Sequence, residues 1–295
     1  MTQTTTAPSS KTDTCCSAPK TATPGAFCWW ENLSRNLPAS RLFYSKVFGW
    51  KLDECAASCG TYISLSNNAR SFGGMMAMPE CVPAQVPSHW GPYVNVVDVD
   101  AATAKVKTLG GTVHVEPQDI PEVGRFSCIA DPTGASLYLF TGLPGRGTQG
   151  YAADNGSFCW TELLTNDPAV ASKFYSALFG WQPSVNDIGG MAYTTFTREG
   201  CDPHDKAGCA GGMMKIKAEW GPHPSNWLSY IWVDNLDGAC NAVTTNGGKV
   251  QCPPTEIPGI GRFAIINDPA GSTVGLFSKP SAKSGCCGSG CGCGE

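Results

Sequence analysis

The chain has 295 residues, 42% of them hydrophobic and 15% charged, which is long enough for one large globular domain or two ordinary ones. Its formal net charge is −4 and it has no run of Lys or Arg, which argues against nucleic acid or a membrane surface as a partner. The first 26 residues lack the apolar core of a secretory signal, and no later stretch is long enough to cross a bilayer, so we expect a cytoplasmic protein.

Most of the chain consists of one pattern that occurs twice. FCWWENLSRNLPASRLFYSKVFGW, at residues 27–50, recurs without a gap as FCWTELLTNDPAVASKFYSALFGW at 158–181. Later in each copy, IPEVGRF and DPTGASLYLF recur as IPGIGRF and DPAGSTVGLF. A fixed internal repeat of this length indicates a duplicated fold.

Each copy begins with an alternating apolar segment, which predicts a strand over residues 27–32 in the first copy. A helix should follow, opened by Asn36 in the first copy and by Asp167 with Pro168 next to it in the second. Short strands containing a Gly-Gly pair come next. These elements together predict one βαβββ module.

A second module follows in each copy. It starts with a strand, continues with a helix opened by Asp100 or Asp237, and ends with two or three more strands. The expected organisation is a disordered segment (1–24), a first domain (25–142), a linker (143–155), a second domain (156–280) and a Cys/Gly-rich tail (281–295).

Two βαβββ modules per copy, FYSKVFGW at the end of the first helix, and GRF, DPTG and LYLF at the end of the copy resemble the vicinal oxygen chelate superfamily. This superfamily includes glyoxalase I, bleomycin-resistance proteins and extradiol dioxygenases. More narrowly, the chain is similar to the duplicated glyoxalase-like "hydroxylase" group. The resemblance implies an α+β fold of tandem glyoxalase-like domains, whose four modules form two open, cup-shaped mixed sheets.

The resemblance also implies His or Glu metal ligands on the first and last strands of each metal-dependent domain. The matching positions here are Trp29 and Trp160 on the first strands and Tyr138 and Gly275 on the last. None of these side chains offers the carboxylate or imidazole that a divalent cation needs. We therefore expect the usual metal centre to be missing from both copies.

Strand alternation separates the residues of FCWWE. If Trp29 faces the cup, Glu31 faces it too, and Cys28 faces the helices as a small buried filler. The second copy repeats this pattern with Cys159, Trp160 and Glu162. A carboxylate that faces inward needs a partner, a cation or a raised pKa, so Glu31 and Glu162 are the candidate catalytic residues.

Repeated polar and aromatic positions could surround these carboxylates, either as a structural network or as a ligand pocket. The candidate partners and ligand-binding residues are Trp29, Trp160, Tyr62, Tyr193, Tyr93, Tyr230, Arg125 and Arg262. Such a cup would suit a flat, partly apolar small molecule.

Four of the sixteen cysteines lie in the last ten residues, as Cys286, Cys287, Cys291 and Cys293. Thiolates spaced by Gly and Ser could bind Cu(I), Zn(II) or a thiophilic metalloid such as As(III). The alternative is a flexible tail with no fixed ligand.

Two functions remain open from the sequence. The first is a metal-independent protein that binds a small molecule in its cups, with a separate soft-metal site in the tail. The second is a lyase, isomerase or oxygenase in which Glu31 or Glu162 holds a divalent metal or moves a proton. Since one chain carries both copies, a monomer is as compatible with this organisation as a homodimer.

Overall fold

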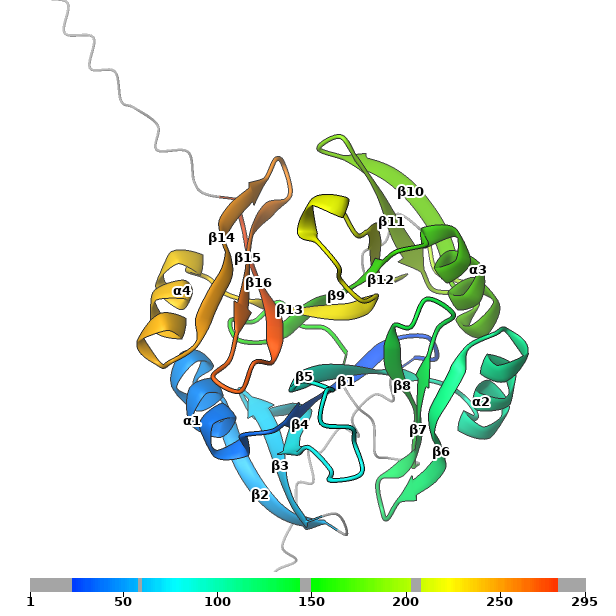
Figure 1. Cartoon of the computed structure of the whole chain (residues 1–295), viewed down its shortest axis with the longest axis horizontal. Coiled ribbons are helices and arrows are strands. Elements are labelled where there is room, and N and C mark those ends of the chain that lie inside the picture. The colour runs from blue at the N-terminus through cyan, green and yellow to red at the C-terminus, as the bar shows by residue number, and fades with distance from the viewer. Residues whose placement is uncertain (1–22, 58–59, 144–149, 203–207, 281–295) are drawn as a thin grey trace, which may run out of the picture.

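The computed structural model describes residues 23–57, 60–143, 150–202 and 208–280. They form two eight-stranded mixed sheets, one from each copy of the repeat (Figure 1). The first copy contains β1 (Phe27–Ser34), α1 (Leu37–Phe48), β2 (Lys51–Ala57), β3 (Gly60–Asn67), β4 (Arg70–Ala77), β5 (His89–Asn95), α2 (Val99–Thr108), β6 (Thr112–Ile120), β7 (Gly124–Ala130) and β8 (Ser136–Gly142).

The second copy repeats this order of elements, with one short 3₁₀ helix between β12 and β13. It contains β9 (Phe158–Thr165), α3 (Pro168–Phe179), β10 (Gln182–Ile188), β11 (Met191–Thr197), β12 (Cys209–Lys215), η2 (Ala218–Trp220), β13 (Asn226–Trp232), α4 (Leu236–Thr245), β14 (Lys249–Ile257), β15 (Gly261–Asn267) and β16 (Thr273–Ser278). No helix in the described parts of the chain has the length and apolar character that crossing a membrane requires.

Each sheet joins two βαβββ modules through their first strands. The strand order in the first sheet is β2-β3-β4-β1-β5-β8-β7-β6, and the second sheet has the same order. β1 pairs in parallel with β4 and antiparallel with β5, which in turn pairs in parallel with β8. The predicted α+β fold of four βαβββ modules in two open cups is confirmed.

The helices begin close to where the sequence predicted. Asn36 caps α1 by accepting a hydrogen bond from the Ala39 amide at 3.3 Å, and Asp167 caps α3 in the same way. The second helix of each copy starts earlier than expected, because Asp98 caps α2 and Asn235 caps α4. The predicted opening residues, Asp100 and Asp237, lie within the first turns and make ion pairs, described below.

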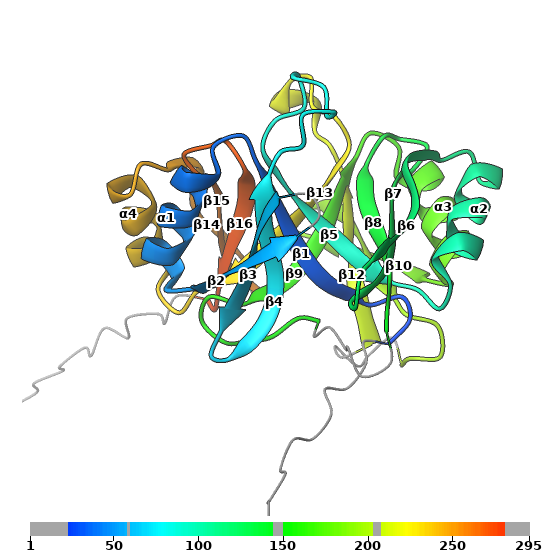
Figure 2. The same ribbon diagram turned by 90° about the horizontal axis from the view of Figure 1, so that it is seen from below.

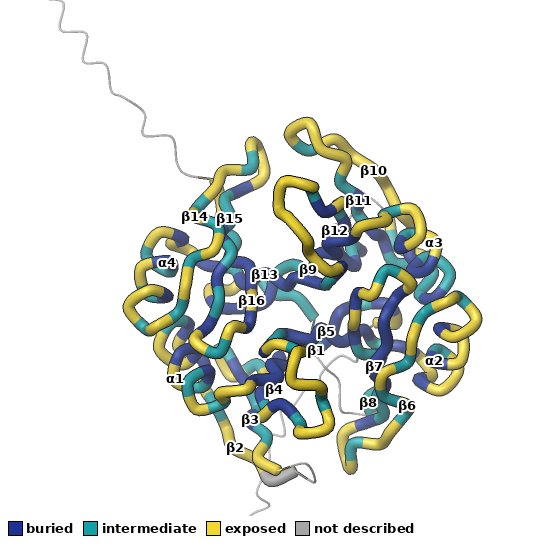
Figure 3. The backbone as a smooth tube through the Cα atoms, viewed as in Figure 1, coloured by how far each residue is buried: buried dark blue, intermediate teal, exposed yellow. Residues whose placement is uncertain are grey.

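The two sheets lie back to back, and their concave faces open in opposite directions (Figures 1 and 2). Helices fill the space between the sheet edges, where α1 contacts α4 and α2 contacts α3. Buried residues concentrate along the central strands of both sheets (Figure 3). The two copies therefore share one interface rather than standing as separate units.

A single hydrophobic core runs through this interface. It includes Trp30 on β1 and Phe158 on β9, whose rings stack with centroids 4.7 Å apart and planes 10° apart. The Trp30 indole also donates a hydrogen bond to the Thr161 hydroxyl of the other sheet at 3.3 Å. Burial of large aromatic side chains on both sides stabilises the pair of sheets together.

Repeated sequence motifs hold the interface through polar contacts. The Trp90 indole donates to the Tyr44 hydroxyl at 2.7 Å, and Tyr44 in turn donates to the carboxylate of Asp268 in the opposite copy. Ser40 also donates to Asp268, at 2.8 Å. The equivalent hydrogen bonds on the other side of the interface run from Trp227 to Tyr175 and from Tyr175 to Asp131. The repeated FY and DPxG motifs thus join the two copies on the side away from the cups.

Candidate functional site

The centre of the first cup is the carboxylate of Glu31. Glu31 lies on β1 between two glycines, Gly74 on β4 and Gly91 on β5, and its side chain is buried. The Tyr93 hydroxyl donates a hydrogen bond to Glu31 Oε2. Burial raises the pKa of Glu31, and the Tyr93 hydrogen bond opposes this only in part.

A second tyrosine, Tyr62 on β3, extends over the neighbouring strand β4 beside Glu31. The Trp29 indole donates to the Tyr62 hydroxyl at 3.1 Å, and this hydroxyl lies directly above Gly74. A Cβ atom at Gly74 would stand 1.8 Å from the Tyr62 hydroxyl oxygen, so only glycine leaves room for the tyrosine. Gly74, the second glycine of the Gly-Gly pair, is therefore part of the site.

The second cup repeats this arrangement around Glu162, which is also buried. The Tyr230 hydroxyl donates to Glu162 Oε1 at 2.7 Å, and Tyr193 donates to the same carboxylate while accepting from the Trp160 indole at 2.8 Å. Gly212 makes room for Tyr193 as Gly74 does for Tyr62. Burial again raises the pKa of the carboxyl, here Glu162, against both tyrosine hydrogen bonds.

The floors of the two cups differ at two positions on neighbouring strands. In each cup one of the two positions is glycine and the other carries a large side chain, and the strand that carries the large side chain differs between the cups. In the first cup, Tyr138 on β8 stacks on Tyr93 at 4.4 Å and covers Gly91, where a Cβ atom would lie 2.4 Å from the Tyr138 ring. In the second cup the position of Gly91 is held by Leu228, opposite Glu162, and the position of Tyr138 by Gly275. At this pair of positions the first cup therefore has an aromatic ring where the second has an aliphatic side chain.

The structure brings together the predicted Trp, Glu and Tyr residues of each cup, but it places the predicted arginines elsewhere. Arg125 makes a bidentate ion pair with Asp100 in the first turn of α2, at 2.7 and 2.9 Å. Arg262 pairs in the same way with Asp237 of α4, at 2.8 and 3.0 Å. Of the two kinds of partner expected for the cup carboxylates, arginine or tyrosine, the structure shows the tyrosines, and the bonds of these two arginines instead attach a strand to a helix.

The expected orientation of Cys28 is also wrong. An irregularity in the β1–β5 pairing between Phe27 and Trp29 shifts the alternation, so Cys28 packs with Tyr93 and Phe140 on the cup side. Cys159 likewise packs with the second cup's residues. Burial raises the pKa of the Cys159 thiol to about 12, so this cysteine is a packing residue and not a reactive thiolate.

The donor groups of the cups do not fit a divalent metal centre of the usual kind. Each cup presents one carboxylate already bonded to tyrosine, and Tyr138 and Gly275 stand at the expected last-strand ligand positions. Within the residues that the structure describes, no three His, Cys, Asp or Glu side chains come together as metal ligands. The tail residues Cys286, Cys287, Cys291 and Cys293 lie outside the described residues.

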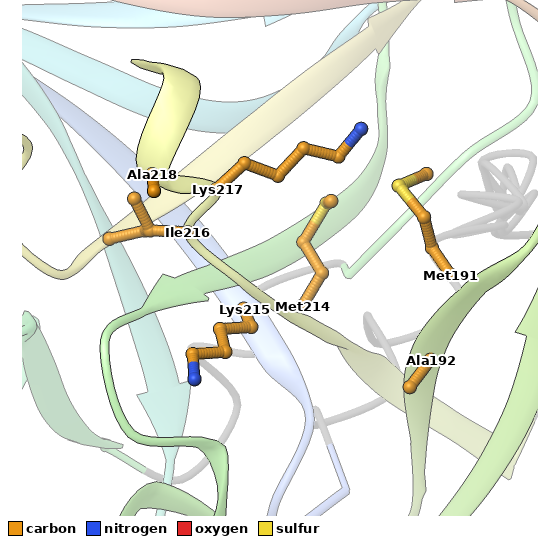
Figure 4. A pocket seen from close by; sticks show the side chains of 7 residues that line it. All are labelled: Met191, Ala192, Met214, Lys215, Ile216, Lys217 and Ala218. Carbon is orange, nitrogen blue, oxygen red and sulfur yellow. The ribbon is translucent and has the colours of Figure 1, made fainter. Parts of the chain in front are cut away.

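A cleft of about 460 Å³ opens at the rim of the second cup (Figure 4). It is lined by Met191, Ala192, Met214, Lys215, Ile216, Lys217 and Ala218. Met214 and Ile216 also pack with the hydrophobic cluster of the cup that contains Trp160. The sequence analysis missed this cleft. The sequence does contain a sign of it, because the two copies differ here: Lys217 follows the second GGMM motif at the position where the first copy has Pro79.

The comparisons with known proteins agree with this geometry. The family model described as "Glyoxalase/Bleomycin resistance protein/Dioxygenase superfamily" matches residues 33–138 and 157–276, which is most of both copies. The chain belongs to this superfamily. A similar protein is CFP32 of Mycobacterium tuberculosis (strain CDC 1551 / Oshkosh), whose name provisionally assigns it to the glyoxylases. It is 33% identical over 260 residues, covering 86% of this chain and 95% of the relative.

Other similar proteins have lower sequence identity to this chain. The anthracycline biosynthesis protein DauV of Streptomyces sp. (strain C5) is 28% identical over 265 residues, covering 84% of this chain and 91% of the relative. The Mn(II)-bound glyoxalase from Novosphingobium aromaticivorans has a TM-score of 0.59 at 15% identity, with 87% of this chain and 82% of that one covered. The 2,2',3-trihydroxybiphenyl 1,2-dioxygenase of Sphingomonas wittichii strain RW1 has a TM-score of 0.56 at 15% identity, with coverage of 86% and 89%. These two likenesses establish the fold.

Proposed function

We propose that this member of the superfamily binds a small, flat, partly apolar molecule in its cup region and does so without a metal ion in the cup. The observation that carries the proposal is the state of the Glu162 carboxylate. It is buried under aromatic side chains and bonded to two tyrosine hydroxyls, Tyr193 and Tyr230. Such a carboxylate is already satisfied, and in the part of the chain that the structure describes it belongs to no group of three His, Cys, Asp or Glu side chains that could hold a cation.

The surroundings support an aromatic or amphipathic ligand. Trp160, Tyr193, Met214 and Phe263 lie in or around the second cup and are only partly buried, so their apolar surface remains accessible from the cup. The rim cleft, at about 460 Å³, falls within the usual size range of small-molecule sites. Two relatives, DauV and the 27% identical DnrV of Streptomyces peucetius, are named for anthracycline biosynthesis, and anthracyclines are polycyclic aromatic compounds. Their names favour a ligand with fused flat rings.

Metal analysis of the purified chain lacking residues 281–295 tests the metal-free part of the proposal. The expected result is less than one tenth of an equivalent of manganese, iron, nickel or zinc per chain after dialysis. A stoichiometric metal that is retained by this chain and lost in Glu31→Gln or Glu162→Gln would overturn it.

An enzyme is the second candidate function, and the raised pKa of Glu162 favours it. Because burial raises its pKa, this carboxyl keeps its proton to a higher pH than a free glutamate and is better suited to donate it, and the Tyr230 hydroxyl fixes its orientation. In that case the ligand is a substrate, and Glu162→Gln should abolish turnover while leaving the dissociation constant within about three-fold. If the wild-type protein and the variant both bind the ligand and neither turns it over, the enzyme function is contradicted and only the binding function remains.

The cysteine tail carries a separate proposal that rests on the sequence. Cys286, Cys287, Cys291 and Cys293 offer four thiols within eight residues, a density that suits Zn(II), Cu(I) or As(III). Removal of residues 281–295 should eliminate binding of these ions and leave small-molecule binding in the cup unchanged. Equal uptake of zinc and arsenite by the full chain and the truncated chain would contradict a tail site.

A further inference from the structure

We infer that the two cups have diverged and that the second one, at the rim cleft beside Lys217, binds an anionic aromatic ligand. This inference rests on the proposed function and adds to it the place of binding and the charge of the ligand. Four features of the described chain support it: the residues of the cleft, the counterparts of those residues in the first copy, the floors of the two cups, and the surroundings of Lys217.

The cleft is continuous with the second cup through strand β12. Gly212 pairs with Glu162, and Met214, one same-face step further along the strand, pairs with Tyr193 and Leu164. Such a step spans about 7 Å, so a molecule of two fused rings that contacts Met214 lies close to the buried carboxylate. Met191, on the same face of β11 as Tyr193, forms the opposite side of the cleft (Figure 4).

The first copy lacks the chemistry of this cleft. Tyr62 pairs with Met76 just as Tyr193 pairs with Met214, which fixes the correspondence between the two rims. The next position is equivalent too, because the Met78 amide bonds Ser34 as the Ile216 amide bonds Thr165. Lys217 therefore corresponds to Pro79, Ala218 to Glu80 and Met191 to Gly60. At the rim of the first cup, a proline and an acidic residue stand where the second cup has a cation and a small apolar residue.

The floors of the two cups differ as well, because the Tyr138 ring covers Gly91 in the first cup, whereas Leu228 stands at the position of Gly91 in the second. Tyr138 stacks on Tyr93, and the Phe126 ring lies 6.4 Å from Tyr138. The second cup has Gly275 at the position of Tyr138. The floor of the first cup thus has an aromatic ring where the second has an aliphatic side chain, and the rim with a cation belongs to the second cup.

Two neighbours hold Lys217 at the rim. Its ammonium group lies 5.9 Å from the centre of the Trp220 ring and 3.5 Å from Glu219 Oε1, and the Glu219 side chain is 71% exposed. In Figure 4 the Lys217 side chain extends above Met214 toward Met191, while Lys215 points away from them. A ligand carboxylate or phenolate at the cleft would compete with Glu219 for this ammonium group. Loss of Lys217 should therefore weaken the binding of an anionic ligand, and loss of the Glu219 charge should strengthen it.

Calorimetric titration of the full-length protein with 2-naphthoate, and with its neutral isostere 2-naphthamide, tests the inference. We expect one naphthoate site per chain. Lys217→Met should weaken naphthoate binding about three- to five-fold, as removal of a partly exposed ion pair does, and should leave naphthamide binding unchanged. Glu219→Gln should strengthen naphthoate binding about two-fold and have no effect in the Lys217→Met background. Lys249→Met, an exposed lysine at the start of β14, is the matched control.

The outcomes separate the inference from the function on which it rests. Two equivalent naphthoate sites per chain, or naphthoate affinity that is the same in Lys217→Met and Lys249→Met, would overturn the inference and leave binding in the cups intact. Equal losses for naphthoate and naphthamide in Lys217→Met would show that the lysine acts through packing, and would also overturn the charge assignment. If neither compound binds the wild-type protein, the proposed function fails for flat aromatic ligands, and the inference fails with it.

Discussion

Trp30 of the first sheet stacks on Phe158 of the second, with ring centroids 4.7 Å apart. Both side chains are almost fully buried, at 0% and 1% exposed. The contact joins two strands that begin the two copies of the repeat, and each of these strands carries its cup glutamate on the opposite face. The same strands therefore build the interface between the copies and position the two sites.

Trp30→Ala should destabilise both copies at once, because the indole is buried between the two sheets. A buried Trp→Ala change costs about 3–5 kcal/mol, and urea unfolding should still show one transition for the whole chain. Trp220→Ala, at a residue that is 44% exposed, should cost about 0.5 kcal/mol or less. Two separate transitions in the wild-type protein, with only one of them sensitive to Trp30→Ala, would contradict a shared core.

The exchange between the cup floors predicts a coupled pair of substitutions. A Cβ atom at Gly275 would lie 2.2 Å from Cδ1 of Tyr230, so Gly275→Tyr alone should overpack the second cup and cost about 1–3 kcal/mol or more. Adding Leu228→Gly recreates the first copy's pair of Gly91 and Tyr138.

The double variant should be more stable than the sum of the two single effects, by about 1 kcal/mol or more, because the new ring can occupy the space that Leu228 leaves. Urea unfolding of all four proteins measures this coupling. Strictly additive losses would show that the two positions do not exchange volume.

Stability should depend on pH through Glu162. Its pKa is raised in the folded protein above the reference value of 4.5, so the folded state binds the proton more tightly than the unfolded chain. The contribution of this proton to stability is fully present below pH 4.5 and is lost as the pH rises through the folded pKa. Glu162→Gln removes this loss, so its stability relative to wild type should increase as the pH is raised from 4.5 through the folded pKa of Glu162.

The measurement is urea unfolding at a series of pH values, with Glu80→Gln, an exposed site, as the control. A difference between wild type and Glu162→Gln that stays constant across this range, or changes in the other direction, would mean that burial does not raise the pKa of this carboxyl.

Thiol reactivity should follow burial and pKa. Cys128 and Cys159 have pKa values raised to about 12 by burial, whereas Cys55 and Cys81 are exposed. Brief alkylation with iodoacetamide at pH 8, followed by peptide mass spectrometry, should modify Cys55 and Cys81 at least ten-fold faster than Cys128 and Cys159. Equal rates for all four would show that the cup cysteines are accessible thiolates.

Much of the fold could be predicted from the sequence, because the repeat and the strand alternation are both periodic signals. The two copies, the four modules and the inward side chain of Glu31 follow from them, and Tyr93 was among the expected partners of that carboxylate. The roles of these residues in binding and catalysis stay predictions.

What the sequence could not predict depends on contacts between distant segments. The irregular pairing near Phe27 turns Cys28 toward the cup. The pattern of apolar residues in the sequence does not reveal a shift in register of one residue. Arg125 was expected in the cup, but it bonds Asp100 because the first turn of α2 lies beside β7. The role of Gly74 depends on where the Tyr62 hydroxyl ends, which only the packed sheet determines.

Metal-independent binding in the cup is the central claim, and one titration tests it most directly. The dissociation constant of 2-naphthoate is measured by calorimetry on the full-length protein before and after exhaustive dialysis against a chelator. The account predicts the same constant and one site per chain in both samples, since Tyr193 and Tyr230 already satisfy the Glu162 carboxylate. Binding that disappears on chelation and returns with added Mn²⁺ or Fe²⁺ would contradict it.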